Sequence, residues 1–395
     1  MNDAGEGTAL LTPDAARLLR YLRDGTALTR AELAGLTGLA RSTIATRLDG
    51  LVDAGLVVPA GGAASSGGRP PARVAFNPSA RILIAIDLGA THAVVAIADL
   101  AGTILHSEST KIDIAEGPVK VLDWAVSTAE RLLGVCGRPK SDLVGVGVGL
   151  PGPVEHSTGK PVNPPIMPGW DRFDVPGYIG ESFDVPVRVD NDVNLLALGE
   201  HATSWRDQSE LLFVKVATGI GAGIISGGRL QRGAQGSAGD LGHVRVPTTR
   251  DTPTHGDEDA DLEAIASGPA IARWIRESGE QATTSEDVLR LARAGNTVAI
   301  AAIRQAGRDL GEVLATCVNL LNPSVIVVGG SIARAGEHLI AGVREVVYRE
   351  STPLATQYLT IAQSKAGETG GVRGAAIMVI QYTLDVDVTV PRAHP

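Results

Sequence analysis

Residues 238–263, "AGDLGHVRVPTTRDTPTHGDEDADLE", concentrate side chains that can hold a metal ion or a polar ligand. The stretch contains two histidines and seven carboxylates, and it contains no cysteine. Imidazoles and carboxylates ligate metals, and they also form hydrogen bonds with small polar molecules. Taken alone, these residue types are compatible with a metal site, a ligand site or a solvated acidic loop.

Three glycine-containing turns follow apolar stretches that we expect to be buried strands. Ligands in open α/β sheets usually bind where strands end, and glycine lets the backbone approach a phosphate closely. In "DLGAT" (87–91) an aspartate can hold Mg²⁺ through water, while backbone amides and a threonine meet a phosphate. "TGIGAG" (218–223) is a second candidate phosphate loop, and "VVGG" (327–330) can face an adenosine. The candidate nucleotide-binding residues are Asp87, Gly89, Thr91, Thr218, Gly219, Gly221, Gly329 and Gly330. Each turn alone is more often only a turn.

The elements ahead of these sites begin with three helical patterns. Residues 12–25 start with threonine and proline, and residues 29–38 have capping-box spacing, with Thr29 followed by Glu32. Residues 40–55 place four apolar side chains on one stripe: Ile44, Leu48, Leu51 and Val52. The apolar stretches "LVVPA" and "RVAFN" then flank a Gly/Ser-rich turn and predict a two-stranded wing.

Three helices and a wing at this spacing predict a winged helix-turn-helix, whose third helix enters the major groove of DNA. The outward residues at the start of that helix are candidate contacts with bases or phosphates: Arg41, Ser42, Thr43, Thr46 and Arg47. Arg69, in "GGRPP", is a candidate for the minor groove, with a plain linker arginine as the alternative. Ala40, at the cap position, is a poor cap. The patterns alone are also compatible with a small helical domain that carries solvated arginines.

Composition and charge fit a cytoplasmic protein with more than one domain. The chain has 395 residues, 44% of them hydrophobic, with no secretory leader and no apolar run long enough to span a bilayer. Cys136 and Cys317 lie in apolar neighbourhoods, and we expect both to be buried thiols in a reducing compartment. Residues 1–80 carry eight arginines against seven acids, whereas the remainder carries 27 basic and 37 acidic residues. Any polyanionic partner is therefore expected to meet the N-terminal part.

Residues 81–385 resemble the ROK family of repressors and sugar kinases, within the actin, Hsp70 and sugar-kinase superfamily. The most specific segment is "VATGIGAGIISGGRLQRGAQGSAGDLGH" (216–243), whose Gly-x-Gly and Gly-His spacing follows the family signature. The resemblance covers nearly the whole chain, because ROK repressors carry a winged helix-turn-helix in front. It implies an α/β fold class, with that N-terminal domain followed by a two-lobed, ribonuclease H-like domain.

The resemblance implies a division of the chain. We expect a winged helix-turn-helix over 1–60, a wing and linker over 61–80, a first ROK lobe over 81–188, and a second over 189–365. A C-terminal helix at about 366–385 is expected to complete the first lobe.

The resemblance also assigns roles to the sugar-site residues. Asp192, in "VRVDNDVNLLALGE", matches the general base that accepts the proton of the attacking sugar hydroxyl, and a carboxylate suits that role. Asn191 matches a neighbouring sugar contact, and Asn163, in the loop "PVNPPIMPGW", is another candidate. The alternative for "DND" is a turn rich in Asx side chains.

The family pattern answers the question raised by residues 238–263. In the family, a glutamate, a histidine and a later glutamate hold sugar hydroxyls, and three cysteines join the histidine around zinc. Here Asp240, His243 and Glu263 stand at the sugar positions, while Thr254, Gly256 and Asp261 stand at the cysteine positions. One histidine does not make a tetrahedral zinc site, so we expect no zinc and no other metal there. Asp240 is one methylene shorter than the glutamate, a change that fits a ligand sensor better than an optimised kinase.

Two functions follow from the sequence. The first is a sugar-responsive transcriptional regulator, most simply a repressor, that binds operator DNA as a homodimer or higher homo-oligomer and has a sugar or sugar phosphate as effector. The second is an ATP- and Mg²⁺-dependent sugar kinase, alone or combined with DNA binding, for which Asp192 is the catalytic residue. The N-terminal domain, which a kinase does not need, favours the first.

Overall fold

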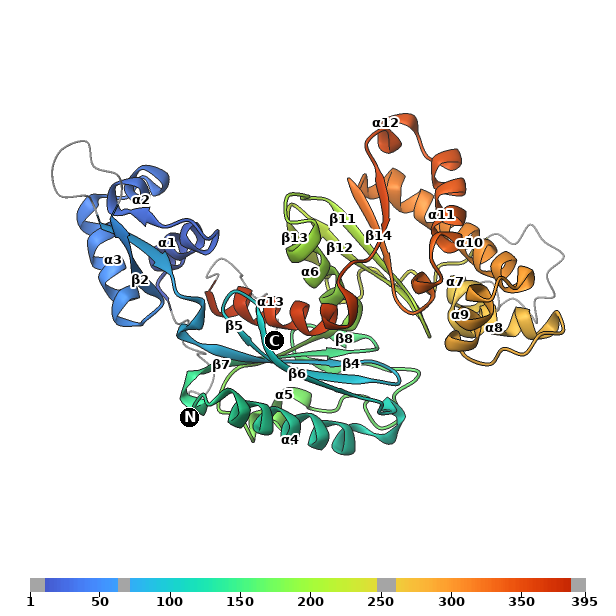
Figure 1. The fold of residues 1–395 in the computed structure, drawn as a ribbon, viewed down its shortest axis with the longest axis horizontal. Coiled ribbons are helices and arrows are strands. Elements are labelled where there is room, and N and C mark those ends of the chain that lie inside the picture. The colour runs from blue at the N-terminus through green and yellow to red at the C-terminus, as the bar shows by residue number, and fades with distance from the viewer. Residues whose placement is uncertain (1–10, 63–71, 247–260, 385–395) are drawn as a thin grey trace. The chain divides into compact units, whose positions relative to one another are not determined.

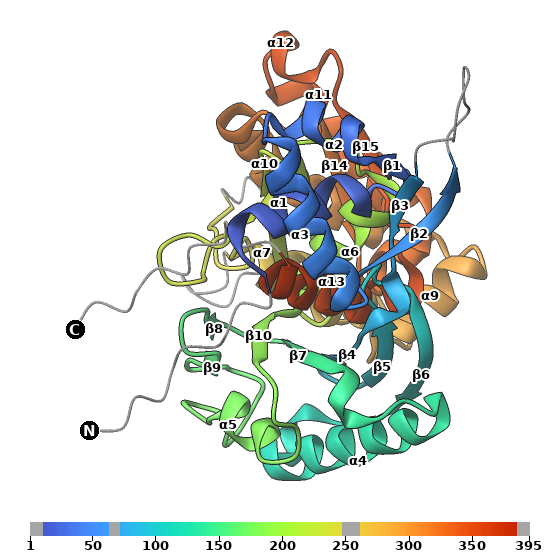
Figure 2. The same cartoon turned by 90° about the vertical axis from the view of Figure 1, so that its left-hand side faces the viewer.

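The computed structural model describes residues 11–62, 72–246 and 261–384. These residues form two compact units. The first comprises the described residues up to Leu150, then Ser157–Val189 and the chain from Ala375; the second comprises Pro151–His156 and Asp190–Gly374. Figures 1 and 2 show their elements in two views. Among the described helices, none is both long enough and apolar enough to cross a membrane.

The N-terminal part of the first unit, the head, is a winged helix. Its helices are α1 (Pro13–Arg23), α2 (Arg30–Thr37) and α3 (Arg41–Asp53). Its sheet has the order β1 (Leu28–Thr29), β3 (Ala72–Phe76), β2 (Val57–Gly62), with β3 antiparallel to both neighbours (Figure 2). The three predicted helices and both wing strands are present, and β1 is an additional strand that the sequence patterns did not indicate.

Local interactions explain where these helices begin. The Thr29 hydroxyl accepts a hydrogen bond from the Glu32 N–H at 3.2 Å, and the Glu32 carboxylate accepts one from the Thr29 N–H at 2.7 Å. The predicted capping box is therefore confirmed, and these hydrogen bonds lower the pKa of Glu32. The predicted stripe of α3 was wrong at Val52, whose side chain is 40% exposed while Leu51 is buried. Adjacent residues point about 100° apart on a helix, so Val52 turns away from the core.

The sheet of the first unit has five strands in the order β10-β7-β4-β5-β6. Strands β4 (Ile82–Leu88), β5 (Ala93–Asp99) and β6 (Ile104–Thr110) form an antiparallel meander, and β7 (Leu143–Leu150) runs parallel to β4. The other elements are β9 (Lys160–Pro161), β10 (Val187–Asn191), α4 (Pro118–Cys136), which packs on β5, and α5 (Val175–Gly180). Every residue of β4 and β5 is buried, as expected for strands in the middle of a sheet.

The second unit repeats this strand order with β13-β12-β11-β14-β15. Its strands are β11 (Leu211–Val216), β12 (Ile220–Ser226), β13 (Arg229–Gln231), β14 (Val325–Gly329) and β15 (Thr360–Gln363). The first three form an antiparallel meander, and β14 runs parallel to both β11 and β15. A meander followed by two further strands on its first-strand side, found twice in one chain, is the predicted ribonuclease H-like, two-lobed α/β fold.

The helices of the second unit surround its sheet. They are α6 (Asp192–Ser204), α7 (Leu262–Ala266), α8 (Gly268–Glu277), α9 (Ser285–Arg293), α10 (Thr297–Leu321), α11 (Glu337–Glu350) and α12 (Pro353–Thr356). Strand β8 (Val154–Glu155) also belongs to this unit, and the last helix, α13 (Gly370–Leu384), continues into the first. After "VVGG" the chain forms a 3₁₀ turn, Ile332–Ala335, and α11 begins after Gly336.

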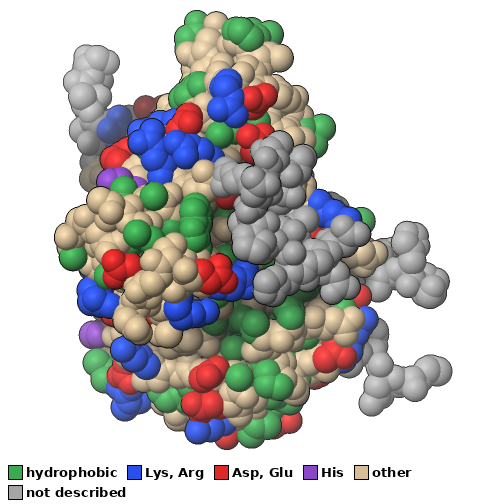
Figure 3. All heavy atoms as spheres, turned by 90° about the vertical axis from the view of Figure 1, so that its right-hand side faces the viewer, with side chains coloured by type: hydrophobic (Ala, Val, Ile, Leu, Met, Phe, Trp, Pro, Cys, Tyr) green, Lys and Arg blue, Asp and Glu red, His purple; other side chains and the backbone are tan. Residues whose placement is uncertain are grey.

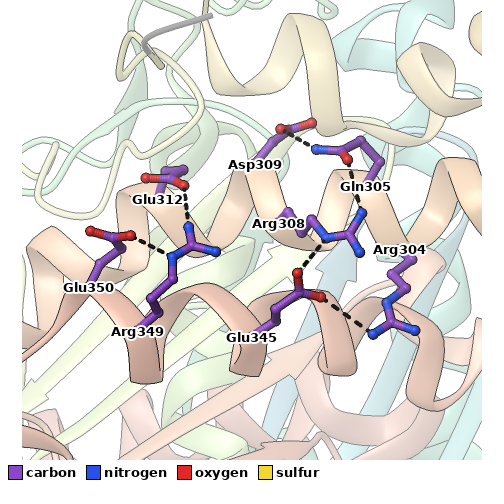
Figure 4. Close-up of polar contacts among 8 residues, drawn as sticks. All are labelled: Arg304, Gln305, Arg308, Asp309, Glu312, Glu345, Arg349 and Glu350. Atoms are coloured by element: carbon purple, nitrogen blue, oxygen red, sulfur yellow. Dashed lines mark hydrogen bonds and ion pairs between the residues drawn. The ribbon is translucent and has the colours of Figure 1, made fainter. Parts of the chain in front are cut away.

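Helices α10 and α11 pack closely, and charged side chains join their exposed faces (Figure 4). Glycine permits the close approach, because a Cβ at Gly307 or Gly342 would collide with the backbone of the other helix. Arg308 donates to Glu345 at 3.0 Å, and this hydrogen bond is the main reason that the pKa of Glu345 is lowered. Exposed ion pairs contribute at most about 1 kcal/mol each, so backbone packing rather than this network holds the helices together.

Both cysteines are less buried than the sequence indicates. Cys136 and Cys317 are half-buried free thiols: Cys136 is the last residue of α4, and Cys317, in α10, packs against the core of the second unit. Burial raises the pKa of both thiols, to about 11 for Cys317. At neutral pH both are therefore protonated and unreactive.

On the face drawn in Figure 3, hydrophobic side chains gather at the upper end, where Figure 1 places α12. The large exposed apolar residues of that segment are Leu354, 78% exposed, and Tyr358, 84% exposed. Acidic and basic side chains alternate over the described part of this face, which is not the pattern of a nucleic-acid surface.

Candidate functional site

The stretch "DND" lies where a strand gives way to a helix. Strand β10 ends at Asn191, and α6 begins at Asp192. The Asn191 side chain caps the helix, because its Oδ1 accepts a hydrogen bond from the Val193 N–H at 2.9 Å. Its Nδ2 donates to the carbonyl of Gly152, also at 2.9 Å. The fold therefore engages both polar atoms of Asn191, as the Asx-turn alternative expects.

Asp190 is a buried structural carboxylate. Its Oδ1 accepts hydrogen bonds from the Asn191 N–H at 2.8 Å and from Asn194 Nδ2 at 2.7 Å. Its Oδ2 pairs with Nε of Arg232 at 2.7 Å. Since a buried carboxylate is tolerated when it is paired and hydrogen-bonded, these contacts account for its burial.

Asp192, the candidate general base, is also paired. Its side chain is 5% exposed, and its Oδ2 contacts the Nζ of Lys215 on β11. The N-terminus of a helix favours a carboxylate, so α6 and Lys215 stabilise the same charge.

Sequence reasoning missed Lys215 and Arg232. The available signal was weak: Lys215 is the one charged residue of "LLFVKV", an otherwise apolar strand, and Arg232 follows β13 directly. An exposed strand end explains either residue equally well, so only the fold reveals that each meets a buried carboxylate.

The loop after β13 brings Asp240 and His243 to the beginning of β12. The Ala222 N–H donates to the Gly239 carbonyl at 2.7 Å, and the Glu263 N–H donates to the Gly242 carbonyl at 2.9 Å. Both Asp240 and His243 are exposed, and His243 Nδ1 lies 3.6 Å from an Asp261 carboxylate oxygen.

Glu263, on α7, faces the same end of β12. Its Oε2 accepts a hydrogen bond from the Ile220 N–H at 2.8 Å. The next strand residue, Gly221, lies against Val193, which follows Asp192 in α6. Consecutive residues of β12 thus contact Glu263 on one side and the first turn of α6 on the other. This places the carboxylates and His243 of the second unit around one strand end, where their acceptor atoms can bind the hydroxyls of a polyol.

The glycines of "TGIGAG" serve the packing of that strand end. Gly219 lies in the turn, and a Cβ there would approach Glu263 Oε2 to 2.6 Å. Thr218 lies in the same turn. Gly221 and Gly223 lie within β12 and face α6, so the sequence marks close helix–sheet packing as well as a candidate phosphate loop. Gly330 has φ +90°, and a Cβ on Gly329 would meet the ring of Phe213.

Four predicted site residues belong to the first unit. Asp87 is the next-to-last residue of the buried strand β4, and Gly89 and Thr91 lie in the hairpin turn that follows, in which the Gly89 N–H donates to the His92 carbonyl at 2.8 Å. Asn163 is exposed and has φ +43°, and its N–H donates to Asp171 at 2.8 Å.

Of the four positions that correspond to the zinc ligands of the family, the structure describes His243 and Asp261. Among residues 11–62, 72–246 and 261–384, no group of three or more His, Cys, Asp or Glu side chains is arranged around a point where a metal ion fits. Thr254 and Gly256 lie outside the described residues, so the predicted absence of zinc stays a prediction.

The candidate DNA-binding residues lie at the start of α3. Arg41, Ser42 and Thr46 are exposed, whereas Thr43 and Arg47 are half-buried. Arg47 lies 3.8 Å from Asp14 of α1, a long contact between two partly exposed side chains. The cap residue Ala40 offers no side-chain hydrogen bond, which leaves the amides at this helix end facing outward. Arg69 lies outside the described residues.

Another buried carboxylate lies on α6. Glu200 is fully buried, and it accepts hydrogen bonds from the Ser364 hydroxyl at 2.7 Å and from the Ala366 N–H at 2.9 Å. The Lys365 N–H donates to it as well, at 3.1 Å. Glu200 therefore joins α6 to the segment that precedes α13.

Comparisons with known proteins identify one family. Residues 83–382 match the family described as ROK. A putative xylose repressor from Caldicellulosiruptor sp. is 29% identical over 381 residues, which cover 93% of this chain and 95% of the relative.

Two solved structures have the same fold. A ROK family transcriptional regulator, described as a homologue of the Escherichia coli MLC protein, is 24% identical with a TM-score of 0.80, covering 94% of this chain and 96% of its own. A ROK family glucokinase from Streptomyces griseus, solved with glucose and AMPPNP, is 26% identical with a TM-score of 0.64. That match covers 75% of this chain and 98% of the glucokinase.

Proposed function

The chain belongs to the ROK family, and on that premise we propose that it is a sugar-responsive transcriptional regulator, most simply a repressor. In this proposal the head binds operator DNA in the cytoplasm, and the second unit binds a sugar or sugar phosphate. The effector changes the affinity of the head for DNA.

One observation carries the proposal: residues 13–62 and 72–76 form a winged helix ahead of the family match, which begins at residue 83. Sugar phosphorylation does not need such a head, and the relative named a repressor is matched over almost its whole length. The outward residues Arg41, Ser42 and Thr46 suit the major groove. Two half-sites of a palindromic operator require two heads, so the proposal includes a homodimer or higher homo-oligomer.

The proposed effector contacts are hydrogen-bond acceptors and one imidazole. Asp192, Asp240, His243 and Glu263 gather around the beginning of β12, and Asn163 and Asn191 are the remaining proposed contacts. Sugars present several hydroxyl donors, which match a site rich in carboxylates. The shorter side chain of Asp240 selects a sugar that reaches further toward the loop.

Fluorescence anisotropy of the full chain tests the proposal. The probe is labelled DNA from upstream of the protein's own gene, titrated in the presence of a panel of neutral sugars and sugar phosphates. We expect sequence-selective binding that one member of the panel changes. Binding that stays equal on scrambled DNA contradicts the operator function, and selective binding that no panel member changes contradicts the effector function.

Two variants separate the head from the ligand site. Arg41→Ala is expected to weaken DNA binding while the protein still binds the effector sugar. Asp240→Ala is expected to keep DNA binding and lose the response to the sugar. If both variants lose both properties, the division of labour between the two units is wrong.

The competing function is sugar phosphorylation, and the match to a glucokinase solved with glucose and AMPPNP favours it. Asp192 is then the base, and Asp87, Gly89, Thr91, Thr218, Gly219, Gly221, Gly329 and Gly330 are the proposed residues for MgATP. Sugar-dependent release of ADP that Asp192→Asn abolishes supports the kinase. The same panel with no release above background supports the regulator without turnover.

A further inference from the structure

Lys215 lies near the end of the central strand of the second unit's sheet. It lies on β11, between β12 and β14, and its cross-strand partners are Gly221 and Gly329. Gly221 has no side chain and lies against Val193, so the lysine has room to extend toward the first turn of α6, while the ring of Phe213 fills the space beside Gly329. Its side chain is only 19% exposed, which is low for a lysine.

The lysine reaches the functional end of α6. Its Nζ contacts Oδ2 of Asp192, whose side chain is 5% exposed. The neighbouring carboxylate, Asp190, is already neutralised by Arg232 and hydrogen-bonded to Asn194. Lys215 therefore forms an ion pair with Asp192, just as Arg232 forms one with Asp190.

This pairing conflicts with the chemistry of a general base. In phosphotransfer a sugar oxygen forms a bond to the γ-phosphorus of ATP, the bond from that phosphorus to the β,γ-bridging oxygen breaks, and ADP leaves. The proton of the sugar hydroxyl passes to the base. With an ammonium on one oxygen of Asp192, that proton transfer would leave a lysine charge without its partner in a buried place, and an unpaired buried charge is costly.

We propose that Lys215 suppresses phosphotransfer by holding Asp192 in an ion pair, and thereby makes the site a binding site. Asp192 still offers its second oxygen to a sugar hydroxyl, so binding survives while proton transfer does not. The inference rests on the proposed effector function and adds the residue that separates sensing from turnover.

The experiment measures sugar-dependent ADP release by the full chain with MgATP and the same sugar panel. Lys215→Gln is expected to raise the rate on the order of 100-fold over the wild-type background, the usual scale of general-base catalysis. Lys215→Arg keeps a positive charge beside Asp192, and its rate of ADP release is expected to stay at the wild-type background. The double variant Lys215→Gln/Asp192→Asn is expected to lose the increase in rate. Lys120→Gln, on an exposed pair with Glu116, is the control for removing a lysine.

Three results of this experiment overturn the proposal. The first is wild-type turnover that Asp192→Asn abolishes. The second is a Lys215→Gln protein that binds MgATP and the sugar and remains at background. The third is weaker MgATP binding by Lys215→Gln, because it makes Lys215 a phosphate ligand. The assay contains no DNA, so a failure of the regulator function and a failure of this proposal are read separately.

A second measurement covers the case in which Lys215→Gln does not fold. In lysine-labelled wild-type protein, the ¹⁵Nζ resonance that Lys215→Arg removes identifies the ammonium. We expect it to remain slowly exchanging when the sugar is bound. A change to rapid exchange on sugar binding shows that the ion pair opens and contradicts the proposal.

Discussion

At the residue scale, the two aspartates that flank Asn191 differ in their partners. Asp190 is surrounded by donors from its own segment and by Arg232, so no acceptor position remains obvious for a ligand. Asp192 has one oxygen on Lys215 and lies at a helix start beside β12. The residue pattern "DND" therefore combines an aspartate that stabilises the fold, a helix cap and the proposed ligand-binding aspartate within three positions.

The Asp192–Lys215 pair has a measurable effect on stability. Lys215→Gln leaves a buried carboxylate without its cation, and such a loss typically costs about 3–5 kcal/mol of unfolding free energy. The double variant Lys215→Gln/Asp192→Asn removes both charges and is expected to recover most of that loss. Urea unfolding of the wild type, both single variants and the double variant measures the coupling. Additive effects of the single changes contradict a direct pair.

Sequence reasoning predicted interactions between residues that are close in sequence, and it did not predict ion pairs between residues that are far apart in sequence. The capping box at Thr29 and Glu32 was predictable because both partners lie within one turn. The partners of Asp190 and Asp192 lie 42 and 23 residues away, and no local pattern records them. The cap that Asn191 provides and its hydrogen bond to the Gly152 carbonyl likewise became visible only in the fold, and its contact with a sugar stays a prediction.

At the element scale, α6 depends on two glycines of β12. A Cβ on Gly223 would approach the Cβ of Ala197 to 2.5 Å and the carbonyl oxygen of Val193 to 2.9 Å. Because the first turn of α6 carries Asp192, the distance between this helix and β12 sets the width of the ligand site.

Gly223→Ala is therefore expected to push α6 away from the sheet. Overpacking of this kind costs about 1–3 kcal/mol. We expect the response to the sugar to weaken at least as much as thermal stability, while DNA binding is retained, as measured by anisotropy and by thermal unfolding. Gly134→Ala, in α4, is the matched control, because nothing lies within 4 Å of the added methyl group. Equal effects of the two changes would show that the α6–β12 distance is unimportant.

The recognition helix α3 yields an electrostatic prediction. If Arg41 contacts a phosphate, Arg41→Ala lowers affinity on every DNA sequence and reduces the slope of log K against log salt by about 1 per head. Anisotropy titrations at several salt concentrations measure the slope. The control is Arg131→Ala, which removes an arginine from α4, where it pairs with Glu108. A sequence-dependent loss with an unchanged slope would instead assign Arg41 to a base.

At the scale of the whole molecule, the two-lobed fold was predictable from the resemblance of residues 81–385 to the ROK family. The apolar stretches separated by glycine turns indicated strands, and the structure shows that both units have the same strand order. Local patterns were less reliable for connections, as the 3₁₀ turn after β14 and the extra strand β1 show. The division of residues between the units was also not apparent, since Pro151–His156 belongs to the second unit although its neighbours on both sides belong to the first.

Linkage between the two functions gives a prediction that is independent of direction. If one equilibrium connects the sugar and operator sites, the factor by which the sugar changes DNA affinity equals the factor by which DNA changes sugar affinity. We expect a factor of roughly 5–150, the range common for allosteric coupling. Anisotropy measures the first factor and calorimetric sugar titration, with and without operator, the second. Unequal factors would exclude a single linked equilibrium.

The buried carboxylate of Glu200 connects α6 to a second segment of the chain. Asp192 starts this helix and Glu200 lies eight residues later, a separation of about 12 Å along a rigid rod. There the Ser364 hydroxyl and the backbone N–H groups of Lys365 and Ala366 donate hydrogen bonds to the Glu200 carboxylate. Any shift of α6 along its axis is therefore shared by the segment Ser364–Ala366. Through the same hydrogen bonds, the position of Asp192 is linked to that of the chain that leads into α13.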